Sequence, residues 1–345
     1  MRNKVLNYIL LLTIITVTAL ILVSSSEFQF IPHLKEMTDF RMIGLAVLCM
    51  LVFWLTDALI FKAILCLSEL KMPLYRYLKL AFVGQYYNMI TPFSAGGQPV
   101  QIYVMTNDYQ VPLGVATSTS INKYMVFHFM TTAFALFMAV FNAHFVFQQG
   151  MISKALICFG LALNVAGVIA IFLICYNSTV VERIARAIIK LLQKFRLAKS
   201  IDDDAIAWHI AEYKNSLKQF FANKRAFIRV TLYSFIQVTA YFAVTYFVYL
   251  SLGLSGSTFF EILAVQSILY SAANVIPTPG NAGASEGIFY LLFGLIFPKN
   301  LMISAIILWR LTVFYLNLVI SGIIVFIDFL VKRYRSKSAC SNIPH

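Results

Sequence analysis

Four ionisable residues stand inside long apolar stretches of this sequence: Asp57, Lys123, Glu286 and Arg310. Inserting a charge into such a stretch costs roughly 2.5–3.5 kcal/mol in a membrane, so each side chain needs a partner or a function. We expect Lys123 and Arg310 to form a cationic pair that faces a central cavity and binds a phosphate group, with Arg310 binding it bidentately. The alternative is an internal salt bridge between Arg310 and Glu286. A bridge that opens to admit phosphate would satisfy both interpretations.

The remaining titratable groups give less specific signals. Asp57 lies in the middle of its apolar run, where it is a candidate for proton or ion coupling, with a bond to a neighbouring helix as an equal alternative. His128 is expected to form interior hydrogen bonds, and His144 to lie at an interface. The sequence has no Ser/His/Asp arrangement, phosphate-cradling glycine loop or metal-ligand spacing. We therefore expect no catalytic residue, no metal and no cofactor.

A nearly repeated phrase interrupts two further hydrophobic regions. TPFSAGGQ begins at Thr91 within the region 77–102, and TPGNAGAS begins at Thr278 within the region 258–297. Proline ends a helical hydrogen-bond ladder and glycine permits unusual backbone angles, so polar peptide groups are freed at membrane depth and must be buried in protein or line a wet cavity. The helix-break residues are Pro92, Gly96, Gly97, Pro277, Pro279, Gly280 and Gly283.

Polar residues accompany both breaks, which favours a binding cavity over kinks that merely let helices pack closely. The partly charged ends of the broken helices would point at the middle of the molecule, where they could hold an ionic group. The expected substrate-binding residues are Lys123, Arg310, Glu286, Asn88, Gln98, Gln101 and Asn281, with Gln85 close by.

The composition is that of an integral membrane protein, because 60% of the 345 residues are hydrophobic and only 12% are charged. The net charge of +13 is better explained by basic cytoplasmic loops and anionic lipid headgroups than by nucleic acid, since no basic patch is joined to a nucleic-acid motif. The five cysteines lack CxxC spacing and mostly sit in apolar runs, so they predict neither disulfides nor a metal site.

Apolar length predicts an all-α polytopic protein with about six full spans and two re-entrant helical hairpins at the interrupted regions. The first span is expected to be a retained helix, not a cleaved signal peptide. The predicted spans are Leu6–Ser25, Ile43–Cys66, Ser118–Phe145, Ile152–Tyr176, Ile228–Leu250 and Met302–Leu330.

Loop charges predict the orientation. Lys and Arg before the first span, after the second and after the last place both termini in the cytoplasm. The long basic segment between the fourth and fifth spans belongs there too, as an amphipathic helix in the headgroup plane followed by a second helix, which begins at Asp202–Asp204 and continues through Trp208 and Phe220. These assignments agree only if the two hairpins enter from opposite faces.

The same offset relates several features of the two halves. Both the quoted phrases (91 and 278) and the two basic residues (123 and 310) are 187 residues apart. The halves are therefore expected to be inverted repeats, an architecture typical of transporters. The expected organisation is a first repeat over 1–145, the first span of the second repeat over 146–177, a cytoplasmic basic segment over 178–225, the rest of the second repeat over 226–331, and a cytoplasmic tail over 332–345.

Two stretches resemble the signature regions of the lysylphosphatidylglycerol synthase transmembrane-region family, also called flippase-like integral membrane proteins. The first is Asn88-x-x-x-Pro92-x-x-x-Gly96-Gly97; the second runs from Pro277-x-Pro279-Gly280 through Gly283 to Glu286. The resemblance covers nearly the whole chain and implies translocation of lipids such as aminoacylated phosphatidylglycerol or polyprenyl-linked glycolipids. Family members often carry an acidic residue and an arginine after the paired glycines, where this chain has Gln98 and Gln101. Because the sequence ends at His345, shortly after the last span, aminoacyl transfer is not expected.

These features together predict a lipid translocase of the inner membrane. Its partners would be a phospholipid or polyprenyl-linked lipid as substrate and anionic headgroups at the cytoplasmic surface, with homo-oligomerisation left open. Two other functions are compatible with the sequence. One is ion-coupled transport of a small anion; the other is a membrane-embedded lipid-glycan transferase that uses Asp57, His128 or Glu286 as acid or base.

Overall fold

The structure is a computed structural model that describes residues 38–143, 150–177, 203–274, 276 and 278–341, with five further residues between 180 and 187. All regular structure in these residues is helical, and five helices are long and apolar enough to cross a membrane. They confirm the predicted spans from Ile43 onward, whereas the predicted span Leu6–Ser25 lies outside the described residues. The spans are α3 (Phe40–Leu65), α6 (Leu113–Phe141), α8 (Met151–Tyr176), α11 (Lys224–Ser251) and a last span made of α14 (Met302–Arg310), the π-helix η6 (Leu311–Tyr315) and α15 (Leu316–Ser341).

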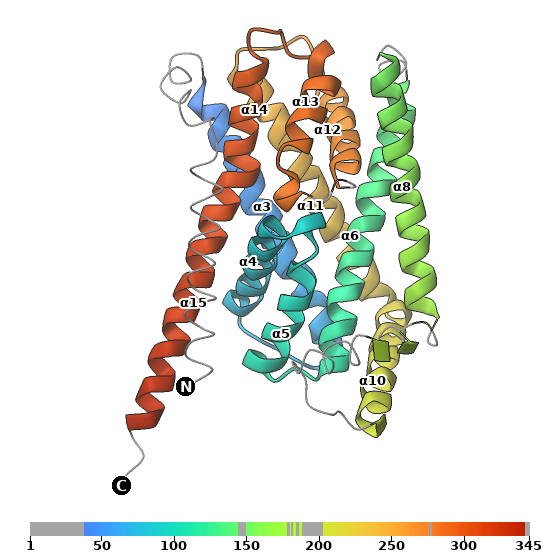
Figure 1. Ribbon diagram of the computed structural model, residues 1–345, viewed down its shortest axis with the longest axis vertical. Coiled ribbons are helices and arrows are strands. Elements are labelled where there is room, and N and C mark those ends of the chain that lie inside the picture. Colours follow the sequence, from blue (N-terminus) through green and yellow to red (C-terminus); the bar gives the residue numbers. More distant parts are fainter. Residues whose placement is uncertain are drawn as a thin grey trace.

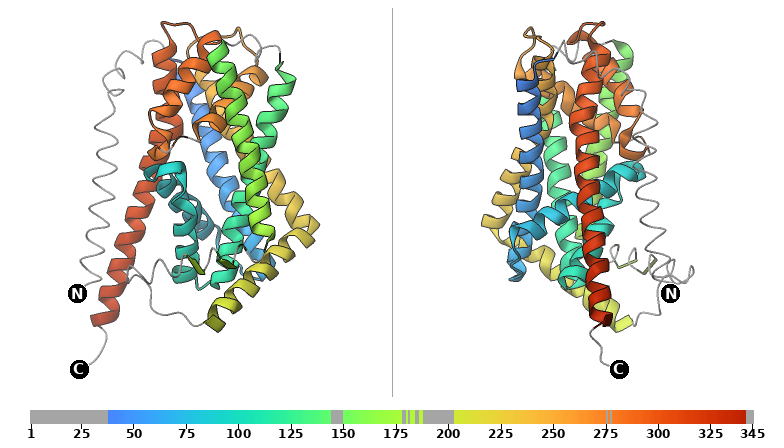
Figure 2. Two further views of the ribbon diagram at one scale, coloured as in Figure 1. Left: turned by 45° about the vertical axis from the view of Figure 1, so that its right-hand side comes forward. Right: turned by 90° about the vertical axis from the view of Figure 1, so that its left-hand side faces the viewer.

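Helices α3 and α11 pack against each other as an antiparallel pair along one side of the bundle (Figure 2). The Asp39 side chain caps α3 by accepting from the Arg41 amide at 2.9 Å, and the Asp39 amide donates to the Ser251 carbonyl at the end of α11 at 2.8 Å. Asn223 caps the start of α11 in the same way. Such caps fix where each helix begins. Because the start of α3 is bonded to the end of α11, the two long helices start at opposite ends of the molecule.

The first interrupted region folds as a helical hairpin. Helix α4 (Leu74–Ile90) is followed by the short turn η3 (Pro92–Ser94) and by α5 (Gly97–Tyr109). Near the turn the Gly97 amide donates to Asn88 Oδ1 at 2.8 Å, and farther away Lys79 Nζ contacts Asp108 Oδ2 at 3.2 Å. The region therefore enters and leaves at the same end of the molecule, as predicted.

The second interrupted region also reverses its direction, through α12 (Phe259–Ala273), η4 (Pro279–Asn281), α13 (Ala284–Leu292) and η5 (Phe293–Leu295). A capping box between Thr258 and Glu261 begins α12. Tyr249, near the end of α11, contacts both sides of this hairpin, because its hydroxyl accepts from the Ser257 amide and its ring packs on Phe297. Figure 1 shows the α4/α5 and α12/α13 hairpins approaching from opposite ends, so that their turns meet near the middle.

Gly280 fixes the contact between the two turns. Its φ is +57°, and a Cβ at this position would lie 2.9 Å from the Met89 carbonyl at the end of α4 and would clash with the Phe314 ring. Only glycine combines this left-handed backbone with so close an approach. The tip of the second hairpin is thereby seated against the first hairpin and the π-helical segment.

Gly280→Ala is expected to lower stability by about 1–3 kcal/mol because the added methyl group meets both a positive φ and two occupied positions. Thermal unfolding in detergent would show a lower midpoint. Gly287→Ala on α13 is the matched control, since a Cβ there meets nothing within 4 Å. Equal midpoints for the two variants would contradict the tight contact between the turns.

Helix α10 (Asp203–Ala222) is the second helix predicted in the basic segment, and it packs against the membrane part of the molecule. Glu212 Oε2 accepts from the Gly114 amide at the start of α6, and Gln219 Nε2 donates to the Leu67 carbonyl after α3. In Figure 2 this helix slants across the lower end of the molecule. Of the predicted amphipathic helix before it, the structure describes only five residues between 180 and 187, and Asp202 lies outside the described residues. Helix α11 already begins at Lys224, before the predicted boundary at residue 225.

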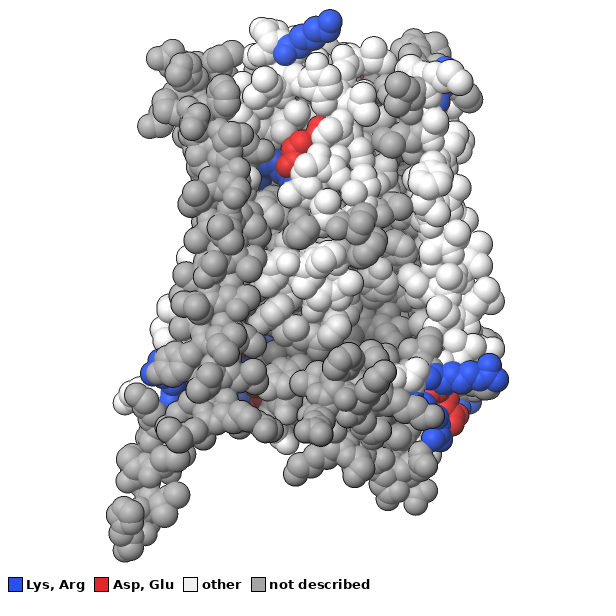
Figure 3. All heavy atoms as spheres, in the orientation of Figure 1, with Lys and Arg blue, Asp and Glu red and all other residues white. Residues whose placement is uncertain are grey.

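Four charges join α4, α5 and α15 at the end that carries α10, which we call the basic end. Lys79 and Lys332 each pair with both Asp108 and Asp328, with Lys332 Nζ 2.6 Å from Asp108 Oδ2. In Figure 3 the described surface between the two ends of the molecule is largely uncharged, as expected for a belt that faces lipid tails.

Asp108→Asn is expected to cost about 1 kcal/mol, because the four charges are only partly buried and act as a network. The difference in unfolding midpoint from the parent protein should shrink at high salt, which screens exposed charges. A difference that does not depend on salt would show that the network contributes through packing and not through charge.

Candidate functional site

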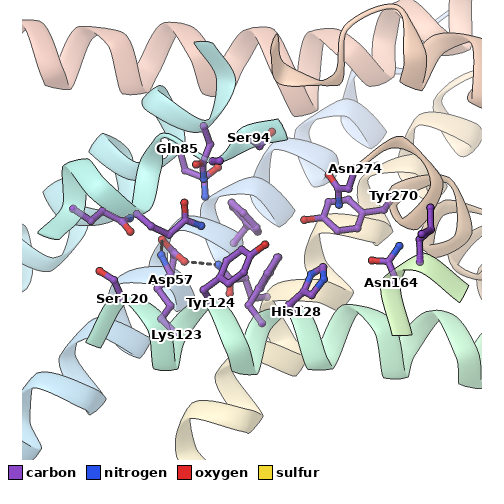
Figure 4. Close-up of a pocket in the computed structure, with 18 residues that line it drawn as sticks. Asp57, Gln85, Ser94, Ser120, Lys123, Tyr124, His128, Asn164, Tyr270 and Asn274 are labelled. Atoms are coloured by element: carbon purple, nitrogen blue, oxygen red, sulfur yellow. Dashed lines mark hydrogen bonds and ion pairs between the residues drawn. The ribbon is translucent and has the colours of Figure 1, made fainter. Parts of the chain in front are cut away.

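Two adjoining chambers lie where the broken hairpins meet. The larger has a volume of about 380 Å³ and takes its walls from α3, α4, α5, α6, α8, α11 and α12, while the smaller, of about 140 Å³, extends toward α13 and η6. Ser94 at the first turn and Asn274 before the second line both chambers, as do Gln85 and Asn88 on α4. Figure 4 shows Lys123, Tyr124 and His128 along α6, opposite Gln85 and Ser94.

Lys123 belongs to a buried cluster in the larger chamber. Its Nζ lies 2.8 Å from Asp57 Oδ2 and 4.2 Å from the centre of the Phe61 ring, and Gln237 Nε2 donates to the other Asp57 oxygen at 2.8 Å. The Asp57 side chain is only 2% exposed. Three helices, α3, α6 and α11, thus supply one ion pair and one amide, and both carboxylate oxygens are bonded.

Arg310 lines the smaller chamber and is bound to the second hairpin. Its Nε donates to Glu286 Oε1 at 2.6 Å, while its two terminal nitrogens lie 3.5 and 3.4 Å from the carbonyl oxygens of Gly280 and Asn281. These carbonyls are peptide groups that the helix break leaves free. Arg310 is 3% exposed and stands directly before the π-helix, a distortion that is frequent at functional sites.

The expected cationic residues therefore lie in adjoining chambers, and each is bonded to a carboxylate of its own. The pairing of Arg310 with Glu286 was one of the two interpretations of the sequence. For Asp57, the structure shows the bond to a neighbouring helix and identifies Lys123 as the partner.

Amide side chains at the first hairpin have structural contacts as well as positions at the cavity. Gln101 is buried, donates to the Leu80 carbonyl and fills the space beside Gly84, and Asn88 holds the Gly97 amide. Gln101 and Asn88 both line the larger chamber, and Asn88 also lines the smaller one. Asn281, at a φ of 56°, donates to Asn274 across the second turn.

Several buried polar atoms of residues in the chamber walls have no hydrogen-bond partner among the residues that the structure describes. In the larger chamber these are Gln98 Oε1, Ser120 Oγ and Gln237 Oε1, and in the smaller chamber Gln266 Nε2, Asn281 Oδ1 and Trp309 Nε1. Burying such groups without a partner costs about 1–3 kcal/mol each. The residues that line the chambers therefore carry unused hydrogen-bonding capacity.

Most of the chamber amides that come from the second half of the chain were not predicted from the sequence. Gln237, Gln266 and Asn274 line the chambers, and Asn317 links Trp54 on α3 to Gln85 on α4. A detectable signal was present, since each is a polar residue in the middle of an apolar run, where an unbonded amide is costly.

Other predicted residues have simpler surroundings. His128 stacks on Tyr124 with a 5.5 Å centroid distance and faces Gly167 on α8, so it lines the larger chamber. Pro277 and His144 lie outside the described residues. Within the described part of the chain, no group of three or more His, Cys, Asp or Glu side chains could hold a metal ion.

Apolar spans, two broken hairpins and a polar interior define a multi-pass helical membrane protein. Residues 8–321 match the family described as the lysylphosphatidylglycerol synthase TM region, and the chain belongs to that family.

Two similar proteins come from archaea, and both are described as UPF0104 membrane proteins. The one from Archaeoglobus fulgidus is 22% identical over 329 residues, which cover 94% of this chain and 97% of the relative. The one from Pyrococcus horikoshii is 26% identical over 327 residues, covering 91% and 96%. The likeness extends over essentially the whole of each relative.

Proposed function

We propose that this protein is a flippase that moves a phosphate-bearing lipid headgroup across the cytoplasmic membrane. The observation that carries the proposal is the position of Arg310. It is a buried guanidinium in the wall of the smaller chamber, held by Glu286 and by the carbonyls of a broken helix. A phosphate that displaces Glu286 would replace one charge-assisted bond with another.

The proposed mechanism keeps the two parts of the lipid in separate surroundings. The headgroup enters the polar chambers, where buried amides and hydroxyls replace its water, while the hydrocarbon chains stay in the bilayer. Lys123 supplies a second cation, and Asp57 holds it in place when no headgroup is present. Glu286 would neutralise Arg310 between transport events.

The two halves act as inverted repeats in this proposal. The opposed hairpins and the offset of 187 residues support it, because in such transporters the site lies between repeats that rock against each other. The basic end would face the cytoplasm, where Lys and Arg are enriched and anionic headgroups attract them. The charges of the terminal segments favour the same side for both chain termini.

A translocation assay tests the function. The protein is reconstituted into vesicles that contain phosphatidylglycerol with a fluorescent group attached to its headgroup. A membrane-impermeant reductant is then added outside. Exchange between leaflets should let the reductant bleach nearly all of the fluorescence, whereas protein-free vesicles should keep their inner-leaflet signal. An inner-leaflet signal that is preserved with the protein present would contradict the proposal.

Two added measurements separate the alternative functions. Uptake of radiolabelled inorganic phosphate without lipid exchange would indicate a small-anion transporter. Mass spectrometry of the vesicle lipids would detect a covalently altered product, as a transferase requires. The flippase proposal predicts unchanged lipid masses and no phosphate uptake.

A further inference from the structure

The larger chamber has walls made mainly of amides, hydroxyls and aromatic rings. Gln85, Gln98 and Gln237 reach it from three different helices, Asn274 reaches it from the end of α12, and Ser120 adds a hydroxyl. An amide side chain both donates and accepts hydrogen bonds, as a hydroxyl group does. A wall of amides therefore matches a ligand that carries several hydroxyl groups.

The polar atoms of this wall that have no hydrogen-bond partner among the described residues are mainly acceptors, so they require donors. Gln98 Oε1 and Gln237 Oε1 are acceptors by chemistry, and Ser120 Oγ can accept or donate. The Gln237 amide nitrogen is already committed to Asp57, which fixes its oxygen as the free atom. The complementary ligand groups, which these atoms reach once their side chains turn toward the chamber, are O–H or N–H donors.

The charges in the chamber wall favour uncharged O–H donors over an ammonium N–H donor. Asp57 is the only carboxylate among the described residues that line the two chambers, and both of its oxygens are bonded. An ammonium group in the larger chamber would have no free counter-ion and would lie in the same cavity as Lys123. Uncharged hydroxyl donors need no counter-ion and are not repelled by Lys123.

Aromatic rings complete the wall. Tyr124 is stacked with His128 at an interplanar angle of 8°, and the Phe127 and Tyr270 rings meet edge to face. Rings of this kind offer flat apolar surface beside polar groups, which suits a cyclic polyol with hydroxyls at its rim and C–H groups on its faces. The volume of about 380 Å³ is in the range of pockets that hold small ligands.

We propose that the larger chamber accepts an uncharged polyhydroxylated headgroup, of the glycosyl or inositol class, whose phosphate is held at Arg310 in the adjoining chamber. This inference rests on the proposed function, which requires only the phosphate. It specifies the chemical class of the group that is attached to the phosphate. Cationic headgroups, such as an aminoacyl group, are excluded.

Binding to three lipids with identical acyl chains tests the inference in detergent micelles or nanodiscs. Phosphatidylinositol carries a polyol ring, phosphatidylmethanol carries a bare phosphodiester, and lysylphosphatidylglycerol carries a cationic group. Phosphatidylinositol should bind about tenfold more tightly than phosphatidylmethanol, because it satisfies buried acceptors that the methyl ester leaves unbonded. Lysylphosphatidylglycerol should bind most weakly.

Variants assign the preference to the chamber. Gln98→Leu and Ser120→Ala should each bring the affinities for phosphatidylinositol and phosphatidylmethanol to within about threefold. Ser120→Ala removes one buried atom that makes no bond in the structure, so it keeps the test available if Gln98→Leu fails to fold. Asn107→Leu is the matched control, an amide-to-leucine change at an exposed position of α5 that should keep the full preference.

The outcomes separate this inference from the proposed function. Equal binding of phosphatidylinositol and phosphatidylmethanol, or tightest binding of lysylphosphatidylglycerol, would overturn the headgroup class and leave the flippase intact. Soluble inositol 1-phosphate that binds as tightly as phosphatidylinositol would support the headgroup class and overturn the lipid function. Failure to bind any of these compounds would overturn both.

Discussion

Replacing Arg310 with alanine is expected to slow headgroup translocation about 100-fold or more in reconstituted vesicles. The guanidinium can donate two charge-assisted hydrogen bonds to one phosphate, each contributing about 1.5 kcal/mol or more, and about 2.7 kcal/mol corresponds to a factor of 100. Arg310→Lys keeps the charge and loses the bidentate geometry, so an intermediate rate is expected.

Controls must separate this effect from misfolding, because Arg310 also bonds Glu286 and two carbonyls of the second turn. The double variant Arg310→Ala with Glu286→Gln leaves no unpaired carboxylate and should recover stability without recovering transport. Arg229→Ala changes an exposed arginine on α11 and should leave the rate unchanged. Transport at the parental rate by a folded Arg310→Ala protein would rule out the proposed role.

The second large effect is expected at the buried pair of Lys123 and Asp57. Lys123→Met should cost about 3–5 kcal/mol of stability, because it leaves a nearly fully buried carboxylate with only the Gln237 amide as partner. Thermal unfolding in detergent would measure the loss. Lys332→Met, which removes a half-exposed lysine at the basic end, should cost much less.

The double variant Asp57→Asn with Lys123→Met tests the reason for that loss. Replacing both charges with neutral groups of similar shape should restore most of the stability, since a buried pair is often no more stable than its neutral replacement. If the double variant is as unstable as Lys123→Met, then the single-variant effect arises from packing. Its translocation rate reports separately whether Lys123 assists Arg310.

The spans could be predicted from the sequence because each depends on one continuous property, about 20 apolar residues in a row. The same holds for the two hairpins, since Pro92 and Gly280 act locally through backbone geometry. Helix ends were less exact. Helix α6 begins at Leu113 and not at Ser118, directly after Pro112, because proline is favoured at a helix start.

Partners across the fold were harder to predict than the helices. The sequence marked Asp57 and Lys123 as costly charges, yet only the packing of α3 against α6 pairs them. Arg310 and Glu286 are 24 residues apart within one half, and this pairing was foreseen as an alternative. Gln237 and Asn274 were overlooked because single amides in apolar helices carry no pattern of spacing.

The proposed transport requires a hydrated chamber at the meeting point of the two hairpins. In a variant without native cysteines, Ser94→Cys would place a thiol in the wall of both chambers, and Phe129→Cys would place one on the outer surface of α6 beside His128. A charged, membrane-impermeant thiol reagent should label Ser94→Cys in vesicles, should label it more slowly when phosphatidylinositol is present, and should leave Phe129→Cys unmodified. A Ser94→Cys protein that is as unreactive as Phe129→Cys would contradict the central claim.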